Sequence, residues 1–378
     1  MWRNTHPEKS SGWYRNRDPG IMNQKYMESD TPRWKRLLSE SIVDLDALPH
    51  LLPTHREKLE RVVSRYPMRI NPYYLGLIGE ENGPIYRQCV PDIRELDDAD
   101  AAADPLNEEG HSPVYGLTHR YPDRVLLLVS SECAMYCRFC NRKRKVGRGA
   151  MVTDTSIEQG IGYIRAHEEV RDVLLSGGDP LLLEDARLGE ILSAIRAISH
   201  VEIIRIGTRV PCTLPQRVTP ELALLLQEFH PLYINAHFNH PLEITPEAAL
   251  ACNRLADVGI PLGCQTVLLK GVNDDLGVMG TLMRKLLTIR VKPYYLFHGD
   301  PVRGTSHFRT STKRGLDIIR GLQGHTSGLS VPHFAIDLLG GGGKVPLLPD
   351  YLRGQDGDDL LATNYAEKSY RHPDGNDD

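Results

Sequence analysis

Short apolar runs alternate with longer amphipathic stretches through the middle of the chain. Six runs rich in branched aliphatic residues have the length and composition of buried strands: Val125–Val129, Val170–Leu175, Val201–Ile206, Leu232–His237, Leu262–Leu269 and Val291–Phe297. The stretches between them, such as Ile157–His167 and Leu188–Ile198, repeat apolar residues at helical spacing. Thr219-Pro-Glu and Thr245-Pro-Glu each place a capping hydroxyl, a proline and an acid where a helix begins. The pattern predicts six strand–helix repeats, followed by a last strand-like run at His333–Ile336.

Nearly continuous apolar strands are typical of a parallel sheet that helices cover. Six such repeats predict an α/β fold that forms a partial, TIM-like (β/α)6 barrel. In barrels of this kind the chemistry lies at the C-terminal ends of the strands. The candidate motifs described below follow strands, so we expect them to gather at one mouth of the barrel.

The regions that flank the repeats differ in composition. We expect an N-terminal arm with a helical extension, the barrel, a C-terminal segment with a lysine motif, and a polar tail, at residues 1–113, 114–330, 331–352 and 353–378. Helical periodicity runs from Thr31 to Pro67, and residues 90–113 form an acidic connector. The tail from Arg353 onwards is rich in Asp, Gly and Asn, so we expect it to be mobile.

Charge and cysteine content indicate which partners and which cellular compartment to expect for this protein. The 45 basic and 49 acidic residues leave a net charge of −4, which offers no broad attraction to nucleic acid or to an anionic membrane. The N-terminus has no basic-then-apolar signal peptide, and no run of about eighteen apolar residues predicts a membrane span. We therefore expect a cytoplasmic protein with no nucleic-acid or membrane partner. Its seven cysteines are expected to stay unpaired in that reducing compartment.

Three of these cysteines, Cys133, Cys137 and Cys140, lie close together directly after the run Val125–Val129. A structural zinc site or a [4Fe–4S] cluster normally takes four protein ligands. Three thiolates would leave one iron of a cluster open for a small molecule, which a reactive cluster needs and an electron carrier does not. A structural metal knuckle that lacks one ligand, or three free thiols, are the alternative interpretations of this motif.

Polar groups follow other predicted strands as well. Gly177, Gly178 and Asp179 end the second strand, where the glycines allow a ligand to approach the backbone and the carboxylate can accept from an ammonium group. Taken alone, this Gly-Gly-Asp-Pro sequence is a common turn. Arg209 and Gln265, from the third and fifth strand ends, would line the mouth of the barrel.

Lys344 follows four consecutive glycines, Gly340 to Gly343. A nucleotide-binding P-loop would need Ser or Thr after the lysine at the start of a helix, but Val345 and Pro346 follow here. A lysine on a flexible glycine stretch can instead form a Schiff base with pyridoxal phosphate (PLP). A glycine-rich surface turn with a solvated lysine is the alternative interpretation.

The Cys-x3-Cys-x2-Cys spacing resembles the signature of the radical S-adenosylmethionine (SAM) enzymes, and the chain resembles their lysine 2,3-aminomutase family from roughly Thr31 to Leu352. Matching stretches occur in order: Gly116–Arg124, the cysteine loop, Arg205–Pro211, His237–Pro241, Leu268–Asp274, Gly304–Thr310, Gly324–Gly328 and Gly340–Lys344. The resemblance implies a barrel of the radical SAM type with a C-terminal PLP-binding segment at 331–352. It also implies three cofactors, namely a [4Fe–4S] cluster, SAM and PLP.

The roles that the family gives to its motifs transfer to this sequence position by position. The residues implied for the cluster are Cys133, Cys137 and Cys140, and those implied for SAM are Gly177, Gly178, Asp179 and Gln265. The residues implied for PLP are Lys344, which would be the catalytic lysine that holds it as an internal aldimine, and Arg120 and Arg124, which would meet its phosphate.

Substrate recognition is implied for three further residues. Arg142 would bind the substrate carboxylate, a task that suits a planar guanidinium. Asp300 and Asp337 would bind the distal ammonium of a lysine, because a cation in a largely dry pocket needs compensating negative charge. A mutase of the same family that acts on glutamate would need neutral or basic groups at these two positions.

We therefore expect an isomerase, an intramolecular aminotransferase, that converts L-lysine to L-β-lysine by radical 2,3-migration of the amino group. The alternatives with the same chemistry are another amino acid, such as ornithine or arginine, or a lysine destined for attachment to an elongation factor. A non-enzymatic iron–sulfur protein or a structural zinc module would not need Lys344 or the two aspartates. We further expect an electron donor such as flavodoxin or ferredoxin, and a homo-oligomer. Extra cysteines that bind structural zinc in some family members are absent, so no zinc site is expected.

Overall fold

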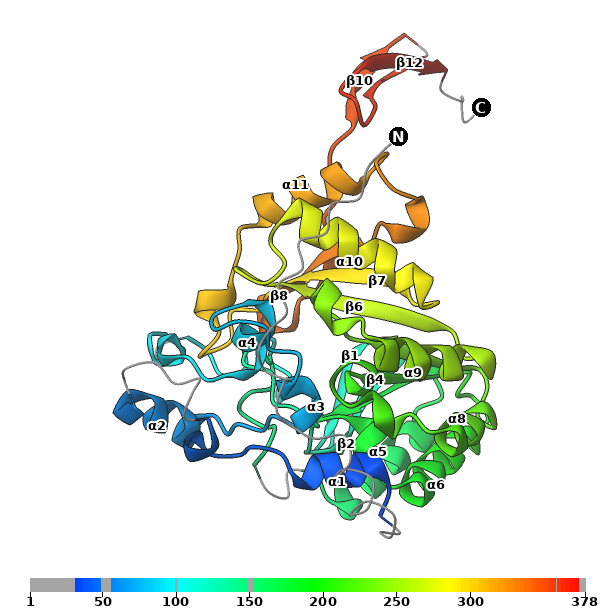
Figure 1. Ribbon diagram of the computed structural model, residues 1–378. Coiled ribbons are helices and arrows are strands. Elements are labelled where there is room, and N and C mark those ends of the chain that lie inside the picture. The colour runs from blue at the N-terminus through cyan, green and yellow to red at the C-terminus, as the bar shows by residue number, and fades with distance from the viewer. Residues whose placement is uncertain (1–30, 49–55, 99–100, 149–151, 358, 374–378) are drawn as a thin grey trace.

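The computed structural model describes residues 31–48, 56–98, 101–148, 152–357 and 359–373, and nine strands within them form one curved sheet (Figure 1). The order of the strands in the sheet is their order in the chain: β1 (Leu117–Tyr121), β2 (Arg124–Ser130), β3 (Asp172–Gly177), β4 (Ile203–Thr208), β5 (Leu232–Ala236), β6 (Leu262–Leu268), β7 (Lys292–His298), β8 (His333–Leu338) and β9 (Gly343–Pro346). Neighbouring strands from β2 to β8 run parallel, while β1 and β9 pair antiparallel at the two edges. The predicted α/β barrel is confirmed, and the two edge strands were not predicted.

Helices cover the outer face of the parallel strands (Figure 1). They are α5 (Asp154–Ala166), α6 (Asp185–Arg196), α8 (Pro220–Gln227), α9 (Pro246–Asp257), α10 (Leu276–Thr288) and α11 (Thr312–Leu322), with the short α7 (Val210–Thr213) after β4. The predicted start signals are confirmed, because Thr219 and Thr245 accept hydrogen bonds from the backbone N–H groups of Leu222 and Ala248. Each helix returns the chain to the N-terminal end of the next strand, so the loops that precede the helices share one mouth of the barrel.

Alternation along each strand separates a packed face from an open one. In β3, Val173 and Leu175 are fully buried in the main hydrophobic core. Their neighbours Leu174 and Ser176 point the other way and line a cavity on the concave side of the sheet. Arg205 on β4 lines the same cavity. The core therefore lies between sheet and helices, and the polar side chains of the strands face the inside of the barrel.

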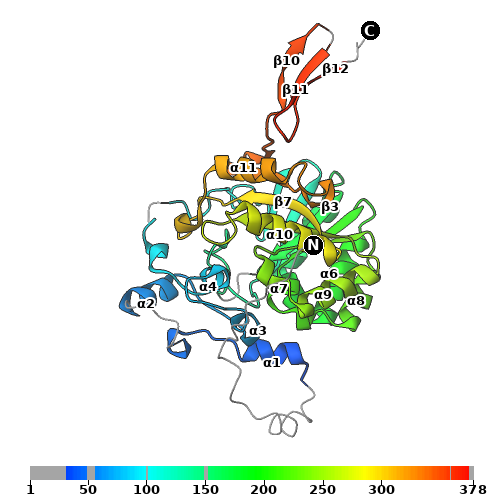
Figure 2. The same ribbon diagram turned by 45° about the horizontal axis from the view of Figure 1, so that its top comes forward.

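The N-terminal extension packs against one side of the barrel (Figures 1 and 2). Its helices are α1 (Arg33–Ser39), α2 (Arg56–Arg65), α3 (Pro72–Leu75) and α4 (Pro84–Cys89). Ile70 forms isolated β-bridges to Ile42 and to Met135 of the cysteine loop. The backbone N–H of Arg138, in the same loop, donates to the carbonyl of Gln88 at 2.9 Å. The extension therefore holds the cysteine loop from outside the barrel. The predicted polar arm over the first thirty residues lies outside the described residues.

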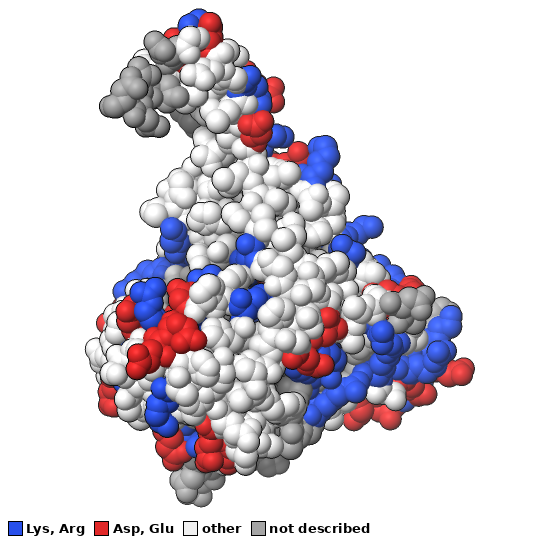
Figure 3. Space-filling model, turned by 180° about the vertical axis from the view of Figure 1, so that it is seen from behind, with Lys and Arg blue, Asp and Glu red and all other residues white. Residues whose placement is uncertain are grey.

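Charged side chains of both signs cover the lobe that this extension forms. Figure 3 shows basic groups gathered there beside acidic ones. Helix α2 alone carries Arg56, Glu57, Lys58, Glu60, Arg61 and Arg65. Among the residues that the structure describes, no helix combines the length and apolar character needed to cross a membrane.

The C-terminal tail forms a small sheet that projects away from the barrel (Figures 1 and 2). Its antiparallel strands are β10 (Leu352–Asp356), β11 (Asp359–Thr363) and β12 (Ser369–Pro373). Arg371 on β12 pairs with Asp356 and Asp359 at 2.6 and 2.9 Å. The sequence predicted a mobile polar tail, and the structure forms three short strands in this segment.

Candidate functional site

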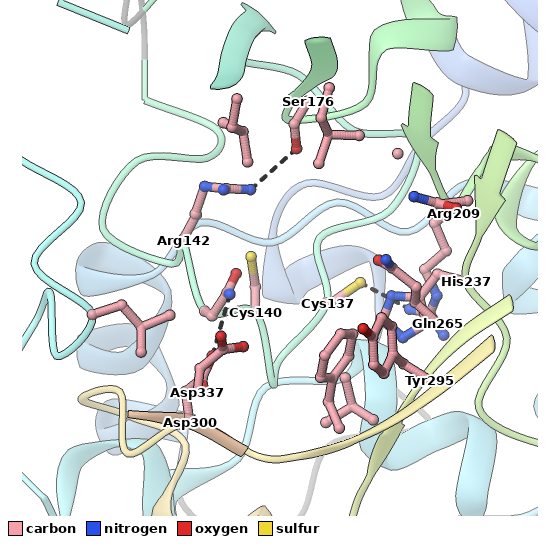
Figure 4. A pocket seen from close by; sticks show the side chains of 18 of the residues that line it. Cys137, Cys140, Arg142, Ser176, Arg209, His237, Gln265, Tyr295, Asp300 and Asp337 are labelled. Atoms are coloured by element: carbon pink, nitrogen blue, oxygen red, sulfur yellow. Dashed lines mark hydrogen bonds between the residues drawn. The ribbon is translucent and has the colours of Figure 1, made fainter. Parts of the chain in front are cut away.

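One cavity of about 650 Å³ opens on the concave side of the sheet, at the C-terminal ends of the strands (Figure 4). All thirteen residues that the sequence singled out for cofactors and substrate line it: Arg120, Arg124, Cys133, Cys137, Cys140, Arg142, Gly177, Gly178, Asp179, Gln265, Asp300, Asp337 and Lys344. They come from segments that are as much as 224 residues apart in sequence, Arg120 to Lys344. The cavity has the size of a typical cofactor site.

The three cysteines follow β2 in a loop that is buried on the side of the N-terminal extension. Their thiols form no disulfide. Burial raises the pKa of Cys133, and it raises the pKa of Cys140 to about 11, so these thiolates would need a nearby cation. No three His, Cys, Asp or Glu side chains among the described residues converge on a single metal ion.

The glycines at the end of β3 pack directly against the start of the cysteine loop. A Cβ on Gly177 would lie 2.2 Å from the carbonyl oxygen of Ser130, and one on Gly178 would lie 2.3 Å from that of Glu132. Gly177 also has a φ of 130°, which side chains disfavour. The backbone N–H groups of Gly178 and Asp179 donate to those same two carbonyls. These glycines therefore let the loop and the strand approach each other, in addition to any approach by a ligand.

The carboxylate of Asp179 already has four hydrogen-bond donors. It accepts from the backbone of Leu181, Arg209 and Val210 and from the hydroxyl of Thr208, at 2.6 to 3.1 Å. Burial raises its pKa to about 6, although these hydrogen bonds act in the opposite direction. This arrangement ties the end of β3 to the β4–α7 turn, and it favours a structural role for Asp179 over direct contact with an ammonium group.

Lys344 lies on the edge strand β9, directly opposite Asp337 on β8. Its Nζ is 3.0 and 3.1 Å from the two carboxylate oxygens of Asp337 and 4.5 Å from the centre of the Phe297 ring. Its backbone N–H donates to the hydroxyl of Tyr121 on β1 at 2.9 Å. Tyr121 thereby links the two edges of the sheet, so the lysine is held on an ordered strand.

The glycine stretch before Lys344, predicted to be flexible, has a defined backbone path in the structure. The glycines form the tight turn between β8 and β9, and Gly340, Gly341 and Gly343 all have positive φ angles of 68° to 92°. A Cβ on Gly341 would lie 2.1 Å from the ring of His111. The turn therefore needs glycine for its backbone angles and for close packing, and both requirements fix where β9 begins.

Two carboxylates face the cavity near Lys344, and we call Asp300 and Asp337 the aspartate pair (Figure 4). Asp300 follows β7 and accepts a hydrogen bond from the Nδ2 of Asn141, which lies next to Cys140, at 3.3 Å. Burial raises the pKa of Asp300 to about 6, and repulsion from Asp337 adds to the effect. The pair therefore provides a strongly negative site that one lysine ammonium compensates only in part.

Arg142 points into the cavity from the end of the cysteine loop (Figure 4). Its guanidinium pairs with Glu108 at 2.7 Å and donates to the hydroxyl of Ser176 at 3.2 Å. Burial works to raise the pKa of Glu108, but Arg142 outweighs it and brings the pKa to about 2. Arg142 would therefore meet a substrate carboxylate while Glu108 holds its other edge. Glu108 lies in the acidic connector, where nothing distinguished it from its neighbours.

Arg120 lies on the edge strand β1, and Arg124 lies on its neighbour β2. Arg120 donates from Nη2 to the carbonyl of Leu106 at 2.6 Å, while its buried Nε has no partner in the structure. Arg124 stacks on the ring of Tyr121, with its guanidinium carbon 4.2 Å from the ring centre. Two cations and an unused N–H donor suit a phosphate group, so these residues fit the role implied for them beside Lys344.

Arg209 is a further cavity residue whose contacts the sequence did not predict. Its Nη1 donates to the Sγ of Cys137 at 2.8 Å. The motif was noted as a polar group at a strand end, but its partners come from segments far away in sequence, such as Gln88 and Glu243. A guanidinium against a ligand thiolate fits a cluster, whose sulfur atoms accept hydrogen bonds.

Two family models match the chain. Residues 127–277 match the model described as the Radical SAM superfamily, which spans β2 to the start of α10. Residues 319–377 match the model described as Lysine-2,3-aminomutase, which begins in α11 and includes Lys344.

Proteins with similar sequences align over most of the chain. The L-lysine 2,3-aminomutase of Fusobacterium nucleatum is 50% identical over 331 residues, which are 86% of this chain and 78% of that protein. That of Acetoanaerobium sticklandii is 48% identical over 356 residues, which are 92% and 86% of the two chains. The glutamate 2,3-aminomutase of Clostridioides difficile is 45% identical over 347 residues, which are 90% and 82% of the two chains. Among solved structures, a radical SAM methyltransferase from Sphaerobacter thermophilus has a TM-score of 0.44 at 20% identity, over 58% of this chain and 67% of that one.

Proposed function

The chain belongs to the lysine 2,3-aminomutase family of radical SAM enzymes, and from this premise we propose that it converts L-lysine to L-β-lysine. The proposal covers the substrate, PLP as a cofactor, and the roles of the residues named above. The observation that carries it is the single cavity in which the three cysteines lie together with Lys344, Arg142 and the aspartate pair.

The residues that line the cavity fit three cofactors, the [4Fe–4S] cluster, SAM and PLP, which would act together. When bound, the cluster and SAM would supply a 5'-deoxyadenosyl radical that takes hydrogen from C3 of the substrate, and PLP would stabilise the radical while the nitrogen migrates. Cys133, Cys137 and Cys140 would hold the cluster. Gln265 and the backbone of Gly177 and Gly178 would line the SAM side.

Lys344 would hold PLP through its Nζ, and Arg120 and Arg124 would hold the phosphate. Arg142 would then fix the substrate carboxylate, with Glu108 keeping its guanidinium in place. These contacts orient the amino acid so that C3 faces the radical source. Orientation of this kind contributes much of the rate of an enzyme, because the reacting atoms are held at contact distance.

Charge exchange at Asp337 supports a cationic substrate. In the structure, Asp337 compensates the ammonium of Lys344 at 3.0 Å. With its Nζ bonded to PLP, Lys344 would no longer supply the ammonium that pairs with Asp337, and the aspartate pair would need another cation. The distal ammonium of lysine would replace it, since uncompensated buried charge is costly. The γ-carboxylate of glutamate would meet repulsion at the same place.

The test is anaerobic turnover. Enzyme with reconstituted cluster, SAM, PLP and dithionite is incubated separately with L-lysine, L-ornithine, L-arginine and L-glutamate, and the products are separated as derivatised amino acids. We expect a 3-amino isomer from lysine in preference to the other three. Equal or higher turnover of ornithine, arginine or glutamate would assign a different substrate to the same chemistry.

A protein-bound or protein-destined lysine is the remaining substrate with a distal ammonium. If free L-lysine is isomerised slowly, incubation of the product with an elongation factor and its lysine ligase would distinguish the two uses. An iron–sulfur protein without catalysis is disfavoured, because it would need neither Lys344 nor the aspartate pair.

An electron donor and a second copy of the chain complete the proposal. A flavodoxin or ferredoxin would reduce the cluster. The basic groups on the lobe of the N-terminal extension (Figure 3), four of them on α2, would attract a negatively charged donor. The exposed β10–β12 sheet would join copies into a homo-oligomer, which sedimentation of the full chain and of a chain ending at residue 351 would test.

A further inference from the structure

The guanidinium of Arg209 lies between the cysteine loop and the wall of the barrel. Arg209 directly follows β4 and precedes α7, and its side chain is only 8% exposed. One nitrogen, Nη1, donates to the Sγ of Cys137 at 2.8 Å (Figure 4). At this distance the N–H points at a sulfur atom that the proposed function assigns to the cluster.

Three fully buried side chains hold the other end of the guanidinium. Nη2 donates to Gln88 at 2.6 Å, to Glu243 at 2.7 Å and to the hydroxyl of Tyr74 at 3.3 Å. They come from α4, from the loop after β5 and from α3, all of them outside the cysteine loop. The backbone N–H of Arg209 is fixed in turn by Asp179 at 2.7 Å. Arg209 therefore cannot move away from Cys137 without breaking several buried contacts.

The charges of this group are arranged asymmetrically around the sulfur. Glu243 is fully buried and balances the charge of Arg209, but it contacts the nitrogen that faces away from Cys137. Burial works to raise the pKa of Glu243, and the attraction of Arg209 outweighs it, so the net shift is downward and Glu243 stays ionised. The guanidinium itself cannot lose its proton in a protein. The sulfur is thus nearer to the positive end of the pair than to the negative end.

We propose that Arg209 is a positioning residue that donates a charge-assisted N–H···S hydrogen bond to Cys137 and raises the reduction potential of the cluster. This inference rests on the proposed function only in that a [4Fe–4S] cluster occupies the three cysteines. Reduction adds one electron, taken from a reduced flavodoxin, ferredoxin or dithionite, to the cluster without a proton. The added negative charge is stabilised by a nearby cation and by donors to the cluster sulfurs, so Arg209 favours the reduced form that cleaves SAM.

The test measures the midpoint potential of the cluster and not the isomerisation. Arg209→Gln combined with Glu243→Gln removes the cation without leaving a buried carboxylate unpaired. Arg217→Lys is the control. Arg217 is also buried and also pairs with a carboxylate, that of Asp185. Its other hydrogen bonds go to the carbonyl oxygens of Leu181 and Leu183, and it contacts no cysteine among the described residues. Each protein is reconstituted, its iron and sulfide are counted, and the reduced cluster is followed by electron paramagnetic resonance in a titration without SAM, PLP or lysine.

We expect the double variant to bind a full cluster whose ratio of reduced to oxidised form, at a fixed donor potential, falls about tenfold, which is 59 mV for one electron. The Arg217→Lys potential should match that of the wild type. An assembled cluster with the wild-type potential in the double variant would overturn the proposal and leave Arg209 a purely structural group. Because the potential is measured without substrate, this result is independent of whether lysine is the amino acid.

A second variant covers the case in which the double variant loses its cluster. Arg209→Lys keeps the positive charge, but one compact ammonium cannot reach Cys137 and the Gln88–Glu243 site together. We expect this variant to keep iron and to show a smaller decrease in potential. If the midpoint potential of Arg209→Lys equals that of the wild type, the hydrogen bond to Cys137 is not what raises the potential of the cluster.

Discussion

Lys344 and Asp337 lie opposite each other on antiparallel strands β9 and β8, with Nζ and Oδ1 3.0 Å apart. This register places the lysine proposed to hold PLP against one of the two carboxylates proposed to bind the substrate. A second link, from the Lys344 backbone to Tyr121 on β1, ties the pair to the other edge of the sheet. The strand pairing therefore fixes both groups in the cavity that also contains the cysteine loop.

Replacement of Lys344 separates its covalent role from its charge. Lys344→Arg keeps a cation against Asp337 but cannot condense with an aldehyde, whereas Lys344→Ala removes both. We expect isomerisation to be abolished in both variants. The absorbance band of the Schiff base between PLP and the protein should be lost in both variants. Their iron content should stay at the wild-type level. Substantial turnover by Lys344→Arg would refute its role.

The aspartate pair should determine specificity for a distal cation. Asp300→Asn and Asp337→Asn each remove one charge without changing shape. We expect kcat/KM for lysine to fall by roughly thirtyfold or more, because loss of a buried ionic partner costs about 2–5 kcal/mol. The comparison substrate is norleucine, which is lysine without the distal amine. If both variants keep the wild-type preference for lysine over norleucine, the pair does not bind the substrate.

Activity should depend on pH through Asp300. Its pKa is raised to about 6 by burial and by Asp337, so the protonated form persists to a higher pH than for an ordinary aspartic acid. Only the carboxylate can attract an ammonium group. The value of kcat/KM for lysine should therefore be constant above about pH 7 and fall as the pH drops through 6, toward tenfold per unit. In Asp300→Asn this acidic limb should be absent. A wild-type profile that stays flat through that range would contradict the assignment.

Close packing at the end of β3 should make the cysteine loop sensitive to one methyl group. In Gly178→Ala, the new Cβ would meet the carbonyl of Glu132 at 2.3 Å. We expect a loss of about 1–3 kcal/mol, typical of overpacking, and reduced iron content after reconstitution. Gly162→Ala is the control, because nothing lies within 4 Å of its added Cβ on α5, and alanine should stabilise that helix by up to about 1 kcal/mol. Normal iron content in Gly178→Ala would show that the loop adapts.

The parallel strands were predictable because their core-facing positions are apolar and several of the alternate positions, such as Leu126 and Leu174, are apolar as well. β1 and β9 were not, since Leu117–Tyr121 has little apolar content and Gly343–Pro346 is four residues long. Their pairing depends on neighbours in space that a sequence pattern does not reveal. The strands of the tail were not predicted for a related reason, because β10 and β12 both pair with β11 and their polar composition gives no strand pattern.

The sequence predicted which residues line the cavity better than it predicted the hydrogen bonds between them. Residues with a motif, such as Cys133 and Lys344, carry their chemistry in the local sequence. The position of the Arg209 guanidinium depends in part on its hydrogen bond to Gln88, which is 121 residues away in sequence. No local sequence signal links these two residues. For the glycines at the end of β3, the sequence identified the right residues but gave an incomplete reason for them. The sequence suggested close approach by a ligand, and the structure shows close approach by the cysteine loop.

The most direct test of the central claim is label transfer within one cavity. Enzyme with cluster, SAM, PLP and dithionite is incubated anaerobically with L-lysine deuterated at C3, and both the amino acids and the recovered SAM are analysed by mass spectrometry. If the radical source and the PLP lysine share the cavity, β-lysine should form and deuterium should also appear in SAM. Formation of β-lysine with no deuterium in SAM, or labelled SAM with no isomerised lysine, would contradict this account.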